Sequence, residues 1–331
     1  MTSQYDLVGI GNALVDVLVT IEDTFLDEHS LPKGSMNLID TAQSDALYDA
    51  VPAGVEVSGG SCGNTMAGFS ALGGKGAYIG KVSDDGLGKV FIHDMKAMGV
   101  DCPIEPATSG PSTGRCIVMV SKDAERTMAT YLGAAVDLGP DDIDEATIKA
   151  AKVLYLEGYL FDPEAAKAAF IKAADIAHEA GGKVSLSLSD PFCVDRHREA
   201  FRALVENHVD ILFANESEIT SLYQVEDFDA ALQKVRGHCE IACLTRSEKG
   251  SVVLSGDEVH VIDADPIGDK LKDTTGAGDQ YAAGFLYGYT QGFDLATAGR
   301  MASIAAAEVV CHYGARPEVH VRDLIREKLA V

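Results

Sequence analysis

The segment Asp273–Asp279 (DTTGAGD) places a Gly-Ala-Gly turn between two aspartates, directly before an apolar stretch typical of a helix. Small residues at a helix start let backbone N–H groups converge on one point, where the helix dipole adds partial positive charge. This arrangement suits the charge on a phosphoryl group during its transfer. Asp279 lies in the first turn, where its ionised form is favoured and can accept a proton from a substrate hydroxyl. The alternative is an ordinary capped helix, but the two flanking aspartates favour the functional interpretation.

A second glycine-rich turn, Gly59–Asn64 (GGSCGN), also leads into a predicted helix. Asn64 places a hydrogen-bond donor and an acceptor near the start of that helix. Glycine turns are common between strands and helices, so this pattern alone is weak evidence for a binding site.

Together the two motifs resemble the signatures of the ribokinase-like (pfkB) family of carbohydrate and nucleoside kinases. Further segments are similar to the adenosine kinases within that family, in the expected order along nearly the whole chain: 11–16 (GNALVD), 25–31 (FLDEHSL), 186–192 (LSLSDPF) and 210–218 (DILFANESE). The resemblance implies an α/β fold of three layers, α/β/α, with a mainly parallel central sheet and a small β-sheet lid. It also implies an ATP-dependent phosphotransferase with an alcohol acceptor, which in adenosine kinases makes AMP and ADP during purine salvage.

The resemblance assigns the acceptor side of the site. Asp279 would be the catalytic base, and the anion hole would consist of three amides, those of Gly276, Ala277 and Gly278. The ribose hydroxyls would be bound by Asn12, Asp16, Gly60 and Asn64. A carboxylate can accept the protons of two vicinal hydroxyls, and an amide can both donate and accept. For Asp16 the alternative is a solvated carboxylate at a strand end. Aromatic and apolar groups would surround the nucleobase of the substrate: Tyr159, Leu160, Phe161 and Phe192.

The resemblance also assigns the ATP side. Asn215 and Glu218 match an Asn-x-x-Glu motif that would place Mg²⁺ and its waters beside the ATP phosphates, although the same spacing is typical of a helix capping box. Arg126 matches a lid arginine that would neutralise charge on the transferred group, with an exposed hairpin arginine as the alternative. Asp273 and backbone carbonyls would hold a monovalent cation such as K⁺.

The nucleotide loop would include Thr245, Ser247 and Gly314. The family's usual Thr-x-Gly reads Thr-Arg-Ser here, and serine restricts the positive φ that glycine allows. Gln280 and Tyr281 also replace the small residue and the phenylalanine that commonly follow the base.

Strands and helices that alternate along the chain must position these residues. Strands are predicted at 5–10, 77–79, 153–156, 184–188, 210–214 and 241–245, with shorter strands at 251–254 and 259–262. Helices are predicted at 63–72, 87–98, 164–180, from about 215, at 279–291 and at 295–311. Such alternation favours a largely parallel sheet covered on both faces.

A small sheet is predicted apart from this body. Residues 16–20 are β-prone and 35–39 are expected to pair with them, while 113–121 and 126–132 are typical of a hairpin. The chain is therefore predicted to be one kinase domain over residues 1–331, with lid segments at approximately 14–45 and 106–135.

Composition narrows the classes of partner. The 331 residues carry 27 Lys+Arg against 51 Asp+Glu, a net charge of −24, and 47% are hydrophobic. This argues against disorder and against binding to nucleic acid or anionic membranes. Seven scattered cysteines and the lack of a signal pattern at the N-terminus favour the cytoplasm. A small-molecule nucleoside or sugar is the expected substrate, and both a monomer and a homodimer remain open.

Other motifs are weak or absent. The sequence has no GxxxxGK[ST], HExxH or paired CxxC, and Gly9-Ile10-Gly11 lacks the third glycine of a dinucleotide fingerprint. Cys239 and Cys243 near His238 lack a second ligand pair and are better explained as buried thiols. The alternatives to an adenosine kinase are a sugar kinase of the same family, acting on ribose, fructose or a ketogluconate, and a non-catalytic nucleoside-binding protein.

Overall fold

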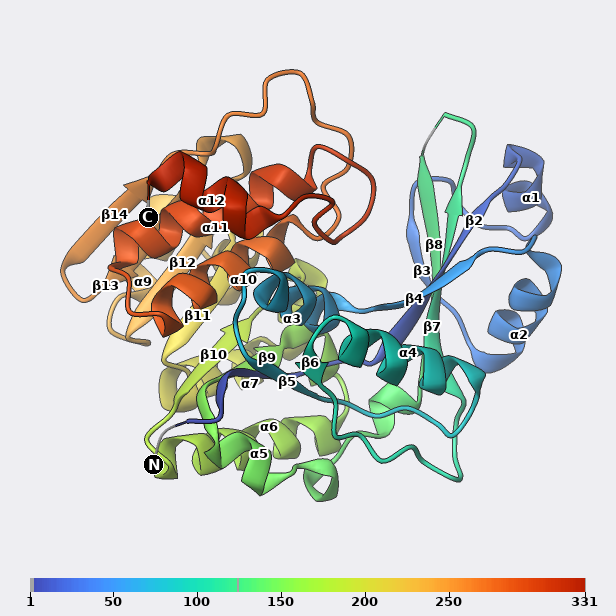
Figure 1. Ribbon diagram of the computed structural model, residues 1–331, viewed down its shortest axis with the longest axis horizontal. Helices are drawn as coiled ribbons and strands as arrows, with labels where there is room; N and C mark the ends of the chain where they lie inside the picture. The colour runs from blue at the N-terminus through green and yellow to red at the C-terminus, as the bar shows by residue number, and fades with distance from the viewer. Residues whose placement is uncertain (1–2, 124, 331) are drawn as a thin grey trace.

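A computed structural model describes residues 3–123 and 125–330 and contains two β-sheets (Figure 1). The larger sheet has nine strands in the order β14-β13-β12-β11-β10-β9-β1-β5-β6. Their bounds are β1 (Tyr5–Ile10), β5 (Gly76–Ile79), β6 (Val100–Asp101), β9 (Ala151–Glu157), β10 (Lys183–Ser187), β11 (Ile211–Asn215), β12 (Ile241–Thr245), β13 (Ser251–Ser255) and β14 (Glu258–Ile262). All neighbours from β6 to β12 are parallel, and β13 and β14 are antiparallel. This confirms the predicted mainly parallel sheet.

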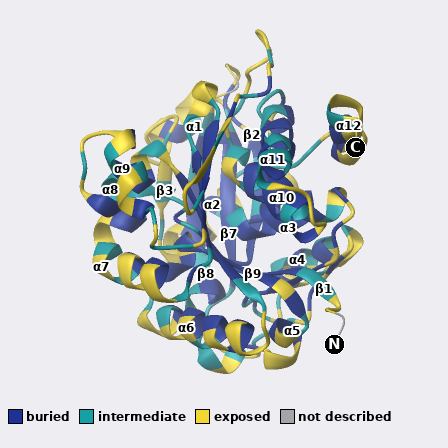
Figure 2. Ribbon diagram, turned by 90° about the vertical axis from the view of Figure 1, so that its left-hand side faces the viewer, coloured by how far each residue is buried: buried dark blue, intermediate teal, exposed yellow. Residues whose placement is uncertain are grey.

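Helices cover both faces of the large sheet and give the three predicted layers. One face packs against α6 (Glu164–Glu179), α7 (Pro191–His208), α8 (Glu216–Tyr223) and α9 (Phe228–Val235), with α5 (Glu145–Lys149) beside α6. The other face packs against α3 (Ser61–Ala71), α4 (Gly86–Ala97), α10 (Ala277–Thr290) and α11 (Leu295–Val309), and α12 (Val321–Leu329) packs on α11. Successive strand residues point to opposite faces, so in β9 Leu154 and Leu156 join one core and Val153 and Tyr155 the other. Figure 2 shows these buried strands inside and exposed helix faces outside.

The second sheet stands to one side of the main body (Figure 1) and has the order β3-β8-β7-β2-β4. Its strands are β2 (Leu14–Thr20), β3 (Met36–Leu38), β4 (Val55–Gly59), β7 (Thr113–Val120) and β8 (Arg126–Gly133). A separate small core joins it to α1 (Asp23–Glu28) and α2 (Thr41–Ala50), and includes Val17, Leu26, Leu47 and Ile117. The predicted lid segments contain β2, β3, β7 and β8, and the sheet additionally includes β4.

The predicted hairpin is present as antiparallel β7 and β8, but the predicted partner of residues 35–39 is wrong. β3 pairs with β8 and not with β2. The physical reason is that β2 has no free edge, because β7 occupies one side of it and β4 the other.

No helix among the described residues has both the length and the apolar character needed to cross a membrane.

Candidate active site

The two glycine-rich turns meet where α3 and α10 begin. Each helix follows a glycine with positive φ, 81° at Gly60 and 78° at Gly276. A Cβ atom on Gly60 would lie 2.4 Å from the carbonyl oxygen of Asn12, and one on Gly276 would lie 2.6 Å from Cα of Ala315. Only glycine fits either position, because both the backbone conformation and the available space exclude a side chain. These turns bring the first turns of α3 and α10 into hydrogen-bonding contact.

Asp279 is held in that contact by two residues of α3. Its Oδ1 accepts a 2.6 Å hydrogen bond from Ser61 Oγ, and its Oδ2 accepts a 3.3 Å bond from Asn64 Nδ2. Burial of the carboxyl group raises the pKa of Asp279 to about 6, and the two hydrogen bonds oppose this rise. A carboxylate with a pKa near neutrality is suited to accept a proton from a hydroxyl group. Ser61 lies inside the second glycine motif, but its contact with Asp279 was not foreseen.

Asp16 approaches the same place from β2 of the small sheet. Its carboxylate covers Gly59, where a Cβ atom would lie 2.4 Å from Oδ1. Burial raises the pKa of Asp16 to about 6, while the positive charges of Arg316 and Arg126 lower it. The charge of Asp16 in turn raises the pKa of Asp279. The structure thus places Asn64 in contact with Asp279, and Asp16 close enough for its charge to affect Asp279.

Asn12 contacts a buried carboxylate, Glu157, that the sequence analysis did not single out. Its Nδ2 donates a 2.8 Å hydrogen bond to Oε1 of Glu157 at the end of β9, and Cys62 N donates a 2.8 Å bond to Oε2 of the same carboxylate. Glu157 is 1% exposed, and burial raises its pKa to about 7. The sequence did offer a signal for Glu157, namely a carboxylate directly after a predicted apolar strand. A carboxylate is rarely buried without a specific partner, so one at this position suggests such a partner.

The ATP-side motif forms the capping box that was its alternative explanation. Glu218 Oε2 accepts from Asn215 N at 2.9 Å and Oε1 from Asn215 Nδ2 at 2.6 Å, while Asn215 Oδ1 accepts from Glu218 N. Burial raises the pKa of Glu218 to about 7. Each carboxylate oxygen still has a second lone pair, and oxygen donors suit Mg²⁺. The pair therefore fits a role in holding Mg²⁺ through its waters.

Asp273 already has a cationic partner. Its Oδ2 forms a 3.0 Å ion pair with Arg126 of β8 and accepts from Gly314 N, and its Oδ1 accepts from Thr275 N and Oγ1. This arrangement does not fit a monovalent cation on the same carboxylate, because both oxygens already have donors. Instead, Asp273 connects the start of the hairpin strand β8 to the loop before α10. Among the described residues, no three His, Cys, Asp or Glu side chains are grouped so that they could hold a metal.

The predicted nucleotide loop lies at the same edge of the sheet. Thr245 ends β12 and pairs in register with Asn215, which ends β11. Ser247 begins the 3₁₀-helix η4 (Ser247–Lys249) with a φ of 52°. Serine therefore adopts the backbone conformation that glycine would adopt with less strain.

The predicted aromatic residues separate into two groups. Phe161 is 3% exposed and packs against Phe170 and Phe201, with Leu160 in the same core, so Phe161 does not line an open slot. Tyr159 is 36% exposed, and burial of its hydroxyl, followed by the charges of Asp190, Asp279 and Glu218, raises its pKa. Phe192, at the start of α7, is 72% exposed. Tyr159 and Phe192 thus stay available to an apolar ligand.

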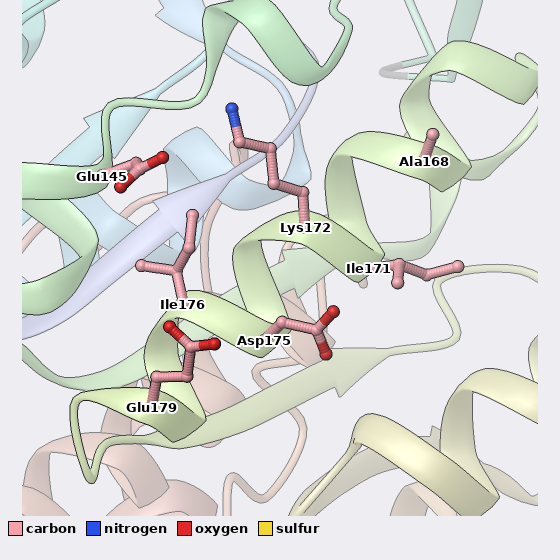
Figure 3. A pocket seen from close by; sticks show the side chains of 7 residues that line it. All are labelled: Glu145, Ala168, Ile171, Lys172, Asp175, Ile176 and Glu179. Carbon is pink, nitrogen blue, oxygen red and sulfur yellow. The ribbon is translucent and has the colours of Figure 1, made fainter.

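Two surface hollows lie away from the candidate site. One follows α6 and is lined by Glu145, Ala168, Ile171, Lys172, Asp175, Ile176 and Glu179 (Figure 3). A second includes Asp210 and Glu240, which precede β11 and β12 at the amino ends of these strands. Asn215, Thr245 and Glu157 lie at the opposite, carboxyl ends. Ligands of open parallel sheets bind at carboxyl ends, so neither hollow belongs to the candidate site.

Comparison with known proteins places this site in a family. Residues 34–321 match the model of the pfkB family carbohydrate kinases, and the chain belongs to that family. It is accordingly a kinase, that is, a phosphotransferase, and the family implies the use of ATP.

Three relatives illustrate the similarity to known proteins. The crystal structure of adenosine kinase from Sinorhizobium meliloti has a TM-score of 0.89 and 46% identity, covering 98% of this chain and 100% of that one. A probable sugar kinase from Rhizobium etli has a TM-score of 0.91 and 44% identity, covering 100% of both chains. Adenosine kinase from Saccharomyces cerevisiae is 28% identical over 322 residues, covering 91% of this chain and 93% of the yeast protein.

Proposed function

We propose that the protein is an adenosine kinase, which transfers the γ-phosphoryl group of ATP to the ribose 5′-hydroxyl of adenosine to give AMP and ADP. The observation that carries this proposal is the convergence of Asp16, Asn64 and Asp279 at the start of α10. The exposed aromatic ring of Phe192, in a segment that resembles adenosine kinases, supports a purine acceptor. The 46% identity to an adenosine kinase over nearly the whole chain supports the same acceptor.

The acceptor would be oriented by hydrogen bonds and then deprotonated. The carboxylate of Asp16 accepts the protons of vicinal ribose hydroxyls, and the second N–H of Asn64 Nδ2 can donate to one of their oxygens. This orientation directs the 5′-hydroxyl toward Asp279, whose carboxylate takes up the proton as the oxygen attacks phosphorus. Positioning and charge stabilisation dominate phosphoryl transfer, so a base with a pKa of about 6 is adequate.

Charge on the transferred group would be met at the start of α10. The amide of Gly278 lies in the first turn of the helix, where the macrodipole adds partial positive charge. Mg²⁺, held through waters at Glu218, would neutralise phosphate charge when ATP is bound. Arg126 lies 3.0 Å from Asp273, so its guanidinium is already beside the loop that precedes this helix. The small sheet that carries Asp16 and Arg126 would act as a lid that excludes water.

A sugar kinase is the second candidate, and the 44% identity to a probable sugar kinase favours it. The two differ in whether an apolar surface receives a purine. An exposed aromatic side chain such as Phe192 offers a stacking surface that a free sugar does not need.

The deciding experiment measures turnover of ATP and Mg²⁺ with adenosine, inosine, cytidine, ribose and fructose. An adenosine kinase has its highest kcat/KM with adenosine and places the phosphate on the 5′-oxygen. Higher kcat/KM with ribose or fructose would identify a sugar kinase, and binding of adenosine without any turnover would identify a non-catalytic binding protein.

A matched pair of variants tests the aromatic surface. Phe192→Ala is expected to raise the KM for adenosine about tenfold, because stacking on a base contributes about 1–3 kcal/mol. Phe293→Ala is the control, since Phe293 is also partly exposed (36%) but lies between α10 and α11. Equal KM values for adenosine in the wild type and Phe192→Ala would remove Phe192 from the acceptor site.

A further inference from the structure

Arg316 lies in the loop between α11 and α12, outside the motifs that define the site, yet its guanidinium reaches the acceptor residues. Its Nε donates a 3.2 Å hydrogen bond to Oδ1 of Asn64. Its Nη2 donates to the carbonyl oxygen of Ser58, and also to Ser58 Oγ at 3.2 Å. One planar group thus connects the loop near the C-terminus to both the end of β4 and the first turn of α3.

The contact with Arg316 determines which way the Asn64 amide faces. A guanidinium only donates hydrogen bonds, so the atom of Asn64 that faces it must be the oxygen. The NH₂ group of Asn64 is then directed toward Oδ2 of Asp279, at 3.3 Å. With the opposite orientation, two donors would face each other and Asp279 would lose a donor.

Gln280, which departs from the family pattern directly after the base, supports the same arrangement. Its Nε2 donates to the backbone oxygen of Asn64 at 3.1 Å and to that of Ala315 at 2.9 Å. Gln280 is 1% exposed, so these bonds are shielded from water. It therefore ties the backbone of Asn64 to the residue that precedes Arg316.

Arg316 also supplies positive charge near two partly buried carboxylates, those of Asp16 and Asp279. Its charge lowers the pKa of Asp16 and that of Asp279, in each case against the larger effect of burial. Without it, two like charges would share a poorly hydrated site, where at least one of them tends to take up a proton.

We propose that Arg316 is a positioning residue of the transfer site, which fixes the Asn64 amide toward Asp279 through its hydrogen bond to the amide oxygen. The inference deepens the proposed function and rests on it for the role of Asp279 as base. It does not depend on which acceptor is phosphorylated.

The charged and titratable groups that act on Asp279 come from several elements. They are Asp16 on β2, Cys62 on α3, Tyr155 and Glu157 on β9, Tyr159 in η3 (Gly158–Phe161), and Arg316. The acidic groups in this set each disfavour the ionised form of Asp279 when they are charged, and Arg316 favours it. Removal of the Arg316 guanidinium is therefore expected to raise the pKa of Asp279 and not to lower it.

The test compares Arg316→Gln and Arg316→Lys with the wild type, and uses Arg322→Gln as the control, because Arg322 is an exposed residue of α12. The assay uses whichever acceptor the wild type phosphorylates best. For Arg316→Gln, the acid limb of the pH profile of kcat/KM is expected to shift to higher pH by about one pH unit, because Asp279 loses a neighbouring positive charge. The KM of the acceptor should rise about tenfold, because the Asn64 amide is no longer fixed.

Arg316→Lys separates charge from geometry. Lysine keeps the positive charge but lacks the planar fork, so the acid limb should stay within about 0.3 pH unit of the wild type while the KM rises several-fold. If Arg316→Gln does not fold, an unchanged KM in Arg316→Lys overturns the proposal and a raised KM with an unmoved acid limb supports it. If Arg316→Gln folds with the KM and acid limb of the wild type, the proposal is wrong.

A second measurement needs no turnover. The carboxyl ¹³C signal of Asp279, assigned by its loss in Asp279→Asn, can be titrated in the wild type and in Arg316→Gln. An upward shift of about one pH unit supports the role of Arg316 even if none of the five acceptors is phosphorylated, which would refute only the proposed function. Coincident titration curves in a folded variant overturn the inference whatever the substrate is.

Discussion

Helices α3 and α10 both begin after a glycine with positive φ, but the amides of their first turns have different partners. At α3, the amide of Cys62 donates to the protein's own buried carboxylate, Glu157. At α10, no acceptor for the amide of Gly278 is found within residues 3–123 and 125–330, and a Cβ atom there would meet nothing within 4 Å. Ala277 N, the middle amide of the predicted anion hole, donates to Thr274 O at 3.2 Å.

This difference shows that a glycine-rich helix start is not by itself a phosphate site. Both starts have the dipole and small residues that attract an anion. At the start of α3 the amide of Cys62 already has an acceptor in Glu157, so this helix start is closed to an external anion and positions Ser61 and Asn64. The start of α10 remains open and carries Asp279. Substitutions at the two helix starts can test whether α3 only positions side chains while α10 receives the transferred group.

The largest effect is expected at the base itself. Asp279→Asn keeps the shape of the side chain but removes the proton acceptor, so kcat should fall by two orders of magnitude or more while acceptor binding changes little. Rapid-quench and equilibrium-binding measurements separate the two quantities. Asp323→Asn is the matched control, because Asp323 also lies in the first turn of a helix, α12. Near-normal turnover of Asp279→Asn would exclude Asp279 as the base.

Gly278→Ala tests whether the open space at α10 is used. The new methyl group meets no atom within 4 Å beyond its chain neighbours and the backbone of its own helix, and alanine is the better helix former, so stability should rise by up to about 1 kcal/mol. If the transferred group occupies that space, kcat should nevertheless fall about tenfold or more. Gly86→Ala offers the same substitution in the first turn of α4, where a Cβ atom also meets nothing. It should gain similar stability without loss of kcat, and equal kcat in both variants would argue against phosphate at Gly278.

Glu157→Gln tests the start of α3, where the amide of Cys62 donates to Glu157. Burial raises the pKa of Glu157 from its ordinary value of 4.5 to about 7, so the unfolded chain releases this proton at lower pH than the folded chain. The free energy of unfolding should therefore decrease as pH rises from about 4.5 to 7, by roughly 3 kcal/mol from this group.

Urea unfolding at pH 5 and pH 7.5 measures this decrease in the free energy of unfolding. The decrease should be smaller in Glu157→Gln, which has no proton to release, by about the contribution of Glu157. It should be unchanged in Glu179→Gln, an exposed position on α6. If Glu157→Gln shows the same pH dependence as the wild type, burial does not hold a proton on Glu157.

The parts of the site that follow local patterns were predictable from the sequence. The strand Ile241–Thr245 has the predicted bounds. Asp279 was singled out by the glycine turn before it, and Asp16 and Asn64 by the family resemblance, and their roles stay predictions. Long-range side-chain partners were not predictable in this way. Glu157 is 145 residues from Asn12, and Arg316 is 252 residues from Asn64.

Two errors have the same physical origin. Residues 35–39 are β-prone, but local propensity does not say which strand has a free edge, and β3 pairs with β8. Phe161 follows a strand like the other aromatic candidates, yet its ring faces the core formed with α7. Helix α7 itself was not predicted, because charged residues dominate its sequence and a kink at His197 interrupts it, although Val194, Phe201 and Leu204 are buried.

The smallest effect is expected at a third turn with positive φ, where the chain has serine and not glycine. Ser247 has a φ of 52°, compared with 81° at Gly60 and 78° at Gly276. An L-residue in this conformation is strained by about 1–2 kcal/mol, and glycine relieves that strain at a cost of about 0.5–1 kcal/mol in chain entropy. Ser247→Gly should therefore stabilise the protein by about 0.5–1 kcal/mol in urea unfolding.

Ser255→Gly, at the end of strand β13, is the control for this substitution. Ser255 is not among the residues with positive φ, so glycine there brings only the entropic cost and should destabilise the protein by about 0.5 kcal/mol. The KM for ATP should stay within about twofold in Ser247→Gly, because the loop already adopts the backbone conformation that glycine prefers. A loss of stability in Ser247→Gly would mean that contacts of the serine side chain outweigh the backbone strain, and that this turn differs from those before α3 and α10.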